Sequence, residues 1–212
     1  MNGLSQWIGA GESVAYWHQL RAEHDAVMVG VGTVLADDPR LTVRHATGRD
    51  PLRVVVDSRL RTPLDAAVLA GEMARGTLLA TTAAASSDAI TAARATGATV
   101  VVVPTGGDGR VDLVALLAAL AERGITTIMV EGGAQVITAL LRLRLANRMV
   151  VCVAPKIMGA GTEAVGDLHV RTLDALLHLE DVQVLRFGVD VVFDGRIVYP
   201  SGDATIAIEL DL

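Results

Sequence analysis

Cysteine is almost absent from this chain, and its scarcity limits the chemistry open to it. Only Cys152 is present among 212 residues. A lone thiol forms no internal disulfide, which favours a reducing cytoplasmic compartment. Because Cys152 lies in the apolar run 150–153, we interpret it as a packing residue rather than a nucleophile. The five histidines show no metal-ligand spacing. We therefore expect a cytoplasmic protein without a metal site.

Aromatic residues and positive charge are also scarce. Aromatic side chains make up 3% of the chain, and 24 Asp and Glu outnumber 18 Lys and Arg, for a formal net charge of −6. A nucleic-acid surface needs a basic stripe and stacking rings, so we expect no nucleic-acid partner. Although 51% of the residues are hydrophobic, no run reaches the ~18 apolar residues of a membrane-spanning helix. Residues 1–20 contain no Lys or Arg, so we expect neither a secretory leader nor a membrane partner.

The chain does have a regular alternation of short apolar runs and longer amphipathic stretches. Fully apolar strands separated by helices indicate a mostly parallel sheet covered on both faces. No stretch reads as an interdomain linker, so the pattern predicts a single domain over residues 1–212. The expected strands are 26–30, 52–56, 77–80, 99–103, 126–130 and 149–154, and the expected helices are 12–24, 87–95, 111–123 and 134–144.

The last quarter of the chain has a different pattern. Alternating runs at 182–187, 189–193 and 196–199 indicate antiparallel strands. Asp194-Gly195, between the last two runs, is a common hairpin turn signal. The predicted fold class is therefore α/β, an open and mostly parallel sheet flanked by helices, with an antiparallel C-terminal edge.

Glycines follow one of the expected strands at the point where a ligand would bind. Ligands of open α/β sheets bind at the carboxyl ends of the strands. Glu131, Gly132 and Gly133 stand between strand 126–130 and the helix that begins at Ala134. The N–H groups and the dipole of that helix suit a pyrophosphate. A tight turn that needs glycine for its dihedral angles explains the same residues, and the motif alone leaves both interpretations open.

Arginines near other element ends have two interpretations as well. Ser58, Arg59 and Arg61 follow strand 52–56, where a hydroxyl and a guanidinium suit a 2′-phosphate and a solvated turn is the alternative. Arg21 and Arg44 either bind a phosphate or form surface ion pairs. His18 and His24 are expected on the surface of the first helix.

Four segments together resemble one known family. LRAEHDAVMVGVGTVLADDPRLTVR (20–44), PLRVVVDSRLRTP (51–63), IMVEGGAQVITALL (128–141) and VAPKIMGAG (153–161) follow one another in that family's order and rough spacing. They are similar to the C-terminal reductase domain of the bifunctional riboflavin-biosynthesis deaminase/reductase, over about residues 5–199. The resemblance implies a dihydrofolate-reductase-like fold and a homodimer. It also implies NADPH-dependent reduction of the ribosyl group of a ribosylaminopyrimidine 5′-phosphate to a ribityl chain, by hydride transfer to C1′.

The resemblance further implies which residues hold the ligands. The positions that match substrate contacts, with the arginines on the 5′-phosphate, are Ser5, Arg21, Leu41, Arg44 and Glu131. Glu131 is the candidate that orients the substrate, and no proton donor is assigned. The cofactor candidates lie at strand ends and in the glycine-containing stretch 133–139; they are Trp7, Thr33, Asp37, Ser58, Arg59, Thr81, Gly132, Gly133, Ala134, Gln135 and Val136.

Two departures from the family pattern affect these expectations. No zinc-dependent deaminase half is recognised, so we expect a stand-alone reductase whose substrate is the deaminated or the diamino pyrimidine. The family's first strand, expected at the sheet centre beside the nicotinamide, has no counterpart before Ser5. The segment 204–210, ATIAIEL, alternates as a strand does. It is either an extra C-terminal edge strand, within residues 200–212, or a replacement for the missing strand, in its own chain or in a dimer partner.

Three functions remain open at this point. The first is the NADPH-dependent pyrimidine reductase that the resemblance implies. The second keeps the fold and the cofactor but acts on a pterin or a related ring. The third is a catalytically inactive nucleotide-binding homologue. Binding of NADPH followed by turnover of the ribosylaminopyrimidine phosphate distinguishes the three.

Overall fold

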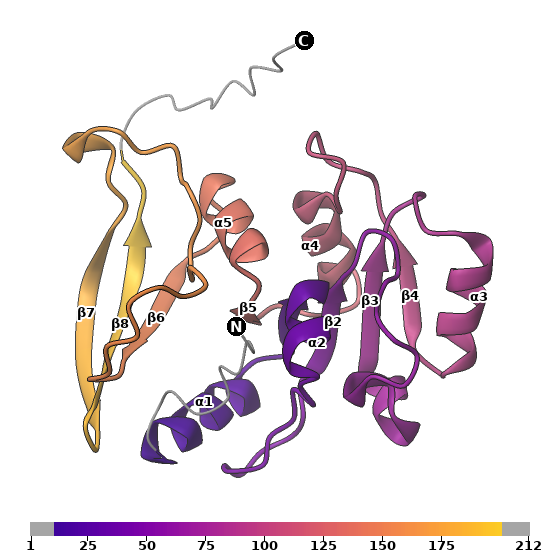
Figure 1. Cartoon of the computed structure of the whole chain (residues 1–212), viewed down its shortest axis with the longest axis horizontal. Coiled ribbons are helices and arrows are strands. Elements are labelled where there is room, and N and C mark those ends of the chain that lie inside the picture. Colours follow the sequence, from indigo (N-terminus) through magenta and orange to yellow (C-terminus); the bar gives the residue numbers. More distant parts are fainter. Residues whose placement is uncertain (1–10, 201–212) are drawn as a thin grey trace.

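The computed structural model describes residues 11–200, which form two sheets (Figure 1). A five-stranded parallel sheet has the order β4-β3-β2-β1-β5, and a three-stranded antiparallel sheet has the order β6-β8-β7. Ser5, Trp7 and the segment 204–210 lie outside the described residues. No helix within residues 11–200 is both long and apolar enough to cross a membrane.

The parallel sheet carries the apolar strands that the sequence predicts. Its strands are β1 (Ala26–Gly30), β2 (Leu52–Val56), β3 (Thr77–Thr81), β4 (Thr99–Val102) and β5 (Ile128–Gly132). The helices are α1 (Gly11–Glu23), α2 (Val31–Asp37), α3 (Ser87–Ala95), α4 (Leu113–Ala121) and α5 (Ala134–Arg142), with short 3-10 turns at Ala67–Leu69, Gly71–Gly76 and Leu173–Ala175. Helix α2, which has only 7 residues, was not predicted from the sequence.

Both faces of the parallel sheet are covered, because successive side chains of a strand point to opposite sides. Val27 and Val29 belong to a buried cluster shared with α2 and α3. Ala26 and Met28 belong to a second cluster, shared with α4 and α5. All five residues of β1 are buried. Continuous apolar sequence is therefore needed in this strand.

Capping side chains set where the covering helices begin. The Asp112 carboxylate accepts hydrogen bonds from the N–H groups of Val114 and Ala115, so α4 begins at Leu113 rather than at the expected residue 111. Ser86 accepts from the N–H of Ala89 and starts α3 at the expected position.

The antiparallel strands form a sheet of their own rather than an edge of the parallel sheet. They are β6 (Arg148–Val153), β7 (His178–Phe187) and β8 (Asp190–Val198). The predicted fold class is otherwise what the structure shows: an open parallel sheet with helices on both faces and an antiparallel C-terminal part.

The hairpin turn predicted at Asp194-Gly195 is wrong. Both residues lie inside the continuous strand β8, and the turn between β7 and β8 is at Gly188, whose φ is 61°. Asp194 is buried and accepts two hydrogen bonds from the Arg148 guanidinium. A Cβ at Gly195 would lie 3.1 Å from the Glu180 carbonyl oxygen, beside an irregularity in β7. The ion pair of Asp194 and the close backbone contact at Gly195 explain why these two residues, which are typical of a turn, lie inside a strand.

Helix α1 connects the two sheets. Ser13 Oγ donates to Asp190 at 2.7 Å, and the Tyr16 ring stacks on Phe187 at a centroid distance of 4.9 Å. Both contacts are with the antiparallel sheet. On the other side, Arg21 contacts Glu131 of β5, and His18 contacts Arg44 in the loop that follows α2. His18 is 3% exposed, so the expectation that it lies on the helix surface is wrong.

Candidate active site

Two strand-to-helix corners meet at one edge of the parallel sheet. β1 runs directly into α2 at Val31, and the neighbouring strand β5 leads through Gly133 into α5. The chain proceeds from β1 to β2, β3 and β4 on one side and returns to the other side of β1 with β5. This reversal of strand order is the position where open α/β sheets bind ligands.

Glycine is required at this corner by close contacts. A Cβ at Gly133, whose φ is +85°, would lie 3.3 Å from the backbone nitrogen of Gly30. A Cβ at Gly132 would lie 3.1 Å from Thr33 Oγ1. Thr33, one of the cofactor candidates, therefore lies against the glycines. The tight-turn interpretation of Gly133 is correct, and the same geometry brings the first turns of α2 and α5 together.

The first turn of α5 has backbone donors directed out of the helix. The N–H groups of Val136 and Ile137 donate to the Gly133 carbonyl at 2.8 and 3.1 Å. Those of Ala134 and Gln135 have no acceptor within the helix, because an α-helix leaves its first N–H groups unpaired. The Val136 side chain is buried, close to Gly30, so it packs in the core. The structure thus leaves the backbone of 134–135 as the part of this turn that can contact an anion.

A half-buried ion pair lies beside the corner. Arg21 of α1 donates from Nε and Nη2 to the Glu131 carboxylate in β5, the latter bond being 2.5 Å long. Its Nη1 donates to the Thr42 carbonyl at 2.9 Å. The two side chains are 12% and 16% exposed. Two of the substrate candidates, which the sequence separates by 110 positions, therefore form one unit.

His18 positions the loop that carries the second arginine. Its Nδ1 accepts the backbone N–H of Arg44 at 3.0 Å, and its ring meets the edge of His45 at 4.9 Å between centroids. Burial lowers the pKa of His18 to about 4, and the charges of Arg21 and Arg44 add to this effect. The imidazole is therefore neutral at physiological pH and able to accept. Leu41, another substrate candidate, is buried in this loop.

Positive charge is in excess at this loop. Within residues 11–200, Arg44 makes no ion pair, and its guanidinium donates to Thr42 Oγ1 at 3.0 Å. Burial lowers the pKa of Arg44, and the charges of Arg21 and Arg40 lower it further. The charge of Arg21 is balanced by Glu131, whereas the attraction of Arg44 to Glu131 and Asp50 is weaker than these opposing effects. An anionic group beside Arg44 would relieve this repulsion.

The other cofactor candidates lie further along the same edge of the sheet. Ser58 follows β2; its Oγ accepts from the Val111 N–H at 3.1 Å, and its carbonyl accepts from the Thr82 hydroxyl at 2.9 Å. Arg59 is exposed beside it. The distance across the sheet from β5 to β3 is three strand spacings, or about 14 Å. The candidates at the carboxyl ends of the strands therefore form two groups, one at β5 and β1 and the other at β2 and β3. Asp37 ends α2, one turn after Thr33.

Thr81, at the end of β3, has an unusual environment. Its side chain is 0% exposed, and its hydroxyl has no hydrogen-bond partner within the described residues. A buried hydroxyl without a partner costs about 1–3 kcal/mol. The orphaned hydroxyl is thus consistent with a polar group completing the site here.

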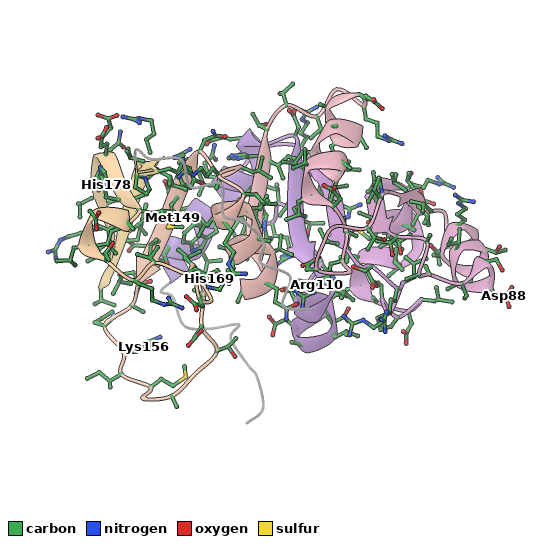
Figure 2. The ribbon with its side chains drawn as sticks, turned by 90° about the horizontal axis from the view of Figure 1, so that it is seen from above. Asp88, Arg110, Met149, Lys156, His169 and His178 are labelled. Carbon is green, nitrogen blue, oxygen red and sulfur yellow. The ribbon has the colours of Figure 1, made fainter. Side chains whose placement is uncertain are left out.

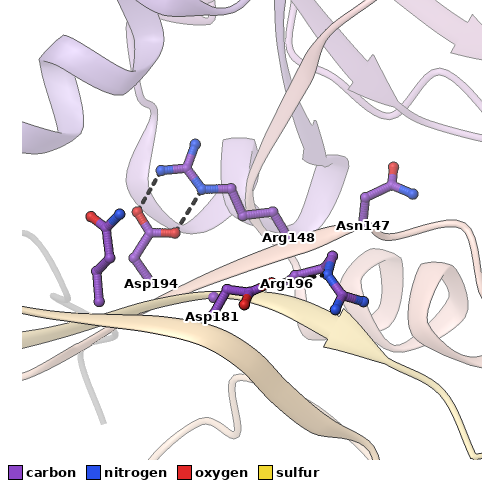
Figure 3. A pocket seen from close by; sticks show the side chains of 7 residues that line it. Asn147, Arg148, Asp181, Asp194 and Arg196 are labelled. Atoms are coloured by element: carbon purple, nitrogen blue, oxygen red, sulfur yellow. Dashed lines mark hydrogen bonds and ion pairs between the residues drawn. The ribbon is translucent and has the colours of Figure 1, made fainter.

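A hollow over the antiparallel sheet lies away from this corner and is not a good candidate site. It has a volume of about 410 Å³ and lies over the antiparallel sheet (Figure 3). Its charged side chains neutralise one another: Arg148 pairs with Asp194, and Arg196 pairs with Asp181 and with Glu180 nearby. The loop after β6 carries Lys156 away from both sheets (Figure 2). Within residues 11–200, no cluster of His, Cys, Asp and Glu suits a metal ion.

Sequence reasoning missed His18 as a site residue. His18 and Arg21 are three positions apart in α1, and residues at this spacing share a helix face. This spacing was the one signal in the sequence that could have identified His18 as a site residue. The partner, the backbone N–H of Arg44, is 26 positions away, so only the folded chain identifies it.

Comparison with known proteins is consistent with this geometry. Residues 1–193 match the RibD C-terminal domain family. The riboflavin biosynthesis protein RibD of Aquifex aeolicus is 36% identical over 193 residues, 91% of this chain and 52% of that protein. A 2,5-diamino-6-ribosylamino-4(3H)-pyrimidinone 5′-phosphate reductase of the same organism is 39% identical over 170 residues, 79% of this chain and 74% of that protein.

A solved structure also resembles the chain. RibD of Acinetobacter baumannii superposes with a TM-score of 0.77 at 24% identity, over 93% of this chain and 53% of that one. This likeness confirms the predicted fold class. The chain spans about half the length of the RibD proteins that it matches.

Proposed function

The chain belongs to the RibD C-terminal domain family, and from this premise we propose that it reduces a ribosylaminopyrimidine 5′-phosphate to the ribitylamino form with NADPH. The main observation in support is the Arg21–Glu131 pair, which lies with Arg44 beside the corner where β1 and β5 end. A fixed carboxylate next to a cation in excess suits a ligand with hydroxyl groups and a phosphate.

A nicotinamide dinucleotide fits the residues along the carboxyl edge. A Cβ at Gly132 or Gly133 would make tight contacts, so the corner is lined by the glycine backbone and the Thr33 side chain. The N–H groups of Ala134 and Gln135 would hold the pyrophosphate, with Thr33 and Asp37 on α2 beside it. Thr81 has a buried hydroxyl without a partner within the described residues, and Ser58 and Arg59, which follow β2, would contact the 2′-phosphate. When bound, the cofactor supplies the hydride for C1′ of the ribosyl group.

The protein's own groups orient the substrate. Arg44 would bind the 5′-phosphate, together with the N–H groups that Arg21 does not use for Glu131 and Thr42. Glu131, held by Arg21, would accept a hydrogen bond from a ribose hydroxyl or from the pyrimidine. His18 would keep Arg44 in place through its backbone. Orientation of this kind lowers the barrier by fixing the reacting atoms before the reaction.

Titration and turnover test the proposal together. NADPH and NADH are titrated separately, and the enzyme is then given the diamino and the deaminated ribosylaminopyrimidine phosphates. We expect tighter binding of NADPH and a product two hydrogen atoms heavier by mass spectrometry. Binding without turnover of either pyrimidine would leave two alternatives, a reductase of a pterin or a related ring and a catalytically inactive homologue. Absence of binding would leave an inactive homologue.

Arg59 provides a sharper test of cofactor choice. Arg59→Ser should raise the Kd for NADPH by about tenfold and leave the Kd for NADH unchanged, because only NADPH carries the 2′-phosphate. Arg75→Ser is the matched control, since Arg75 is an exposed arginine before β3, at the opposite edge of the sheet. Equal weakening of both cofactors by Arg59→Ser would remove this residue from the site.

We also propose that the protein is a cytoplasmic homodimer. Val151, Phe193 and Val184 are directly opposite one another across the antiparallel sheet and are 39%, 38% and 57% exposed. An exposed apolar row of this kind is typical of an interface. Light scattering should show a dimer for the natural chain and a monomer for Phe193→Lys.

A further inference from the structure

The loop that follows β2 is closed around a buried carboxylate. Asp57 is 0% exposed, and its Oδ2 accepts hydrogen bonds from the N–H and the hydroxyl of Thr62 at 2.7 and 2.8 Å. Its Oδ1 accepts from the N–H of Arg59 at 3.4 Å. The loop therefore has a fixed shape, and its buried negative charge is used within the loop. Ser58 is half-buried and Arg59 is exposed, so these two side chains are the ones that the start of the loop presents to a ligand.

A second loop, between β4 and α4, is attached to the first one through Ser58. The N–H of Val111 donates to Ser58 Oγ at 3.1 Å. Val111 also pairs with Thr105 in an antiparallel bridge, and the N–H of Gly106 donates to the Arg110 carbonyl at 2.7 Å. These bonds hold both ends of the turn that contains Arg110. The backbone of Arg110 is therefore fixed beside Ser58.

The two loops meet over the end of β3, because β3 lies between β2 and β4 in the sheet. The Thr82 hydroxyl donates to the Ser58 carbonyl at 2.9 Å, and the N–H of Val103 donates to the Thr81 carbonyl at 2.8 Å. The loops after β2 and after β4 are thus both bound to the residues that end β3. Their position relative to one another does not depend on the single bond at Ser58.

The Arg110 side chain leaves the bridge on the solvent side. Neighbouring residues of an extended segment point to opposite sides. Val111 is 5% exposed and belongs to the buried cluster shared with α4, whereas the Arg110 side chain is 56% exposed. Figure 2 shows Arg110 over the parallel sheet, away from Met149 and His178 of the antiparallel strands. One carbonyl carbon separates the Arg110 Cα from the Val111 nitrogen, so this Cα lies within about 5.5 Å of Ser58 Oγ.

The guanidinium of Arg110 has only a weak partner of its own. Within residues 11–200 its ion pair is with Asp108 at 3.6 Å, and both side chains are 56% exposed. An exposed pair of this length contributes little, because water screens it. The next carboxylate along the chain, that of Asp112, accepts the N–H groups of Val114 and Ala115 at the start of α4. Most of the five N–H donors of the Arg110 guanidinium are therefore available to a ligand.

We propose that Arg110 is a second arginine for the 2′-phosphate of the cofactor, and that this phosphate lies on the Ser58 hydroxyl between Arg59 and Arg110. The inference rests on the proposed function and deepens it, because it adds a specificity-determining residue from a loop that contains none of the cofactor candidates. Ser58 Oγ accepts the N–H of Val111, and its own proton can be donated to an anion. A hydroxyl and two guanidinium groups suit the acceptor oxygens and the double charge of a phosphate.

Binding of NADPH and NADH to single variants tests the role of Arg110. Arg110→Ser should raise the Kd for NADPH about tenfold and leave the Kd for NADH unchanged, because NADH has no 2′-phosphate. Arg110→Lys keeps the charge but not the planar group, so it should raise the Kd for NADPH less. Calorimetric titration measures both constants without turnover. Arg123→Ser is the matched control, since Arg123 is an exposed arginine that follows the other end of α4.

Two further variants test the position of the phosphate. Arg59→Ser combined with Arg110→Ser should bind NADPH no more tightly than NADH, because both contacts with the 2′-phosphate are lost. Asp108→Asn removes the negative charge beside Arg110 and should tighten NADPH binding by about twofold without affecting NADH. The same variants should change the affinity for adenosine 2′,5′-bisphosphate, a cofactor fragment with the 2′-phosphate, and should not change the affinity for AMP.

The outcomes separate this inference from the proposed function. A preference for NADPH that Arg59→Ser lowers and Arg110→Ser does not would overturn the role of Arg110 and leave the proposed function intact. Equal weakening of NADPH and NADH by Arg110→Ser would also overturn it, since the residue would then act on the loop rather than on the phosphate. If the natural protein binds neither cofactor, the proposed function fails and this inference fails with it.

Discussion

The two sheets of this protein use their side chains in opposite ways. In the parallel sheet both faces are covered, and β1 is buried from Ala26 to Gly30. In the antiparallel sheet one face packs against α1, and the other exposes Val151 and Phe193. A strand that is buried on both faces has no side chain to spare for a ligand. Polar chemistry in the parallel sheet is therefore confined to the strand ends, where Glu131 and the glycine corner lie.

The candidate site depends on contact between these two regions. α1 packs on the antiparallel sheet through Ser13 and Tyr16 and extends Arg21 to Glu131 in the parallel sheet. The geometry of the site therefore depends on how α1 joins the two sheets. The following four changes test this comparison, from the largest expected effect on stability to the smallest.

Gly133→Ala should have the largest effect, because it combines backbone strain with a contact. Alanine at a φ of +85° is strained, and its Cβ would lie 3.3 Å from the Gly30 nitrogen. We expect a loss of roughly 2–4 kcal/mol in the free energy of unfolding and a loss of cofactor binding, measured by denaturation and titration. Gly124→Ala is the matched control, since its φ is +79° and its Cβ would meet nothing within 4 Å. Equal losses for the two variants would mean that the corner is not tightly packed.

Glu131→Gln should destabilise the contact between the sheets by about 1–3 kcal/mol, because it leaves the half-buried Arg21 without its carboxylate. The same variant should lower kcat, since the group that orients the substrate loses its charge. Asp167→Asn breaks the exposed pair with Arg171 and should cost less, because water screens that pair. If both variants unfold at the same denaturant concentration, the Arg21–Glu131 pair does not hold the two regions together.

His18 should make stability depend on pH. Its pKa is about 4 in the folded protein against an ordinary value of 6.5, so the unfolded chain binds the proton more readily. The stability is fully present above pH 6.5 and falls as the pH drops toward about 4. The effect should amount to roughly 1–3 kcal/mol over that range. His18→Asn, whose amide oxygen can accept the Arg44 N–H, should reduce the slope of stability against pH and match the natural protein near pH 8. Identical slopes would contradict a buried neutral histidine.

The last test makes a valine-to-threonine substitution once in each sheet. On the antiparallel sheet this substitution should have the smallest effect on stability of the four changes. Val29→Thr buries a hydroxyl in β1 and should cost about 1–3 kcal/mol. Val151→Thr, on the exposed face of β6, should cost less than about 0.5 kcal/mol in dilute solution. The cost of Val151→Thr should rise with protein concentration if the proposed dimer covers that face. A concentration-independent cost equal to that of Val29→Thr would show that the face is covered within one chain.

Local sequence predicts the parallel sheet closely. The expected strands 26–30 and 52–56 and the expected helix 87–95 have the same bounds in the structure. Apolar runs of this length are needed wherever both faces of a strand are covered, so the pattern is local. The antiparallel part was predicted less well. Asp194-Gly195 has the composition of a turn, and its actual role depends on Arg148 and on the irregularity in β7, which no short window of sequence contains.

The candidate site was predicted in part. The glycines at the end of β5 indicated the corner, and the family resemblance supplied Arg21, Arg44, Leu41 and Glu131 individually. Their pairing was not predictable, because Arg21 and Glu131 are 110 residues apart and each could have had other partners. The expectation that His18 lies on the helix surface was wrong, because its burial depends on the loop that carries Arg44, 26 residues away.

The sequence by itself determined the order of strands and helices, the α/β class and the edge of the sheet where a ligand can bind. These follow from apolar runs and glycines, whose effects extend over a few neighbouring residues. Only the tertiary structure decided that Arg21 pairs with Glu131, that His18 holds the backbone of Arg44 and that the strands divide into two sheets. Those features depend on which distant groups meet, and burial and hydrogen bonding between distant groups exist only once the chain has folded.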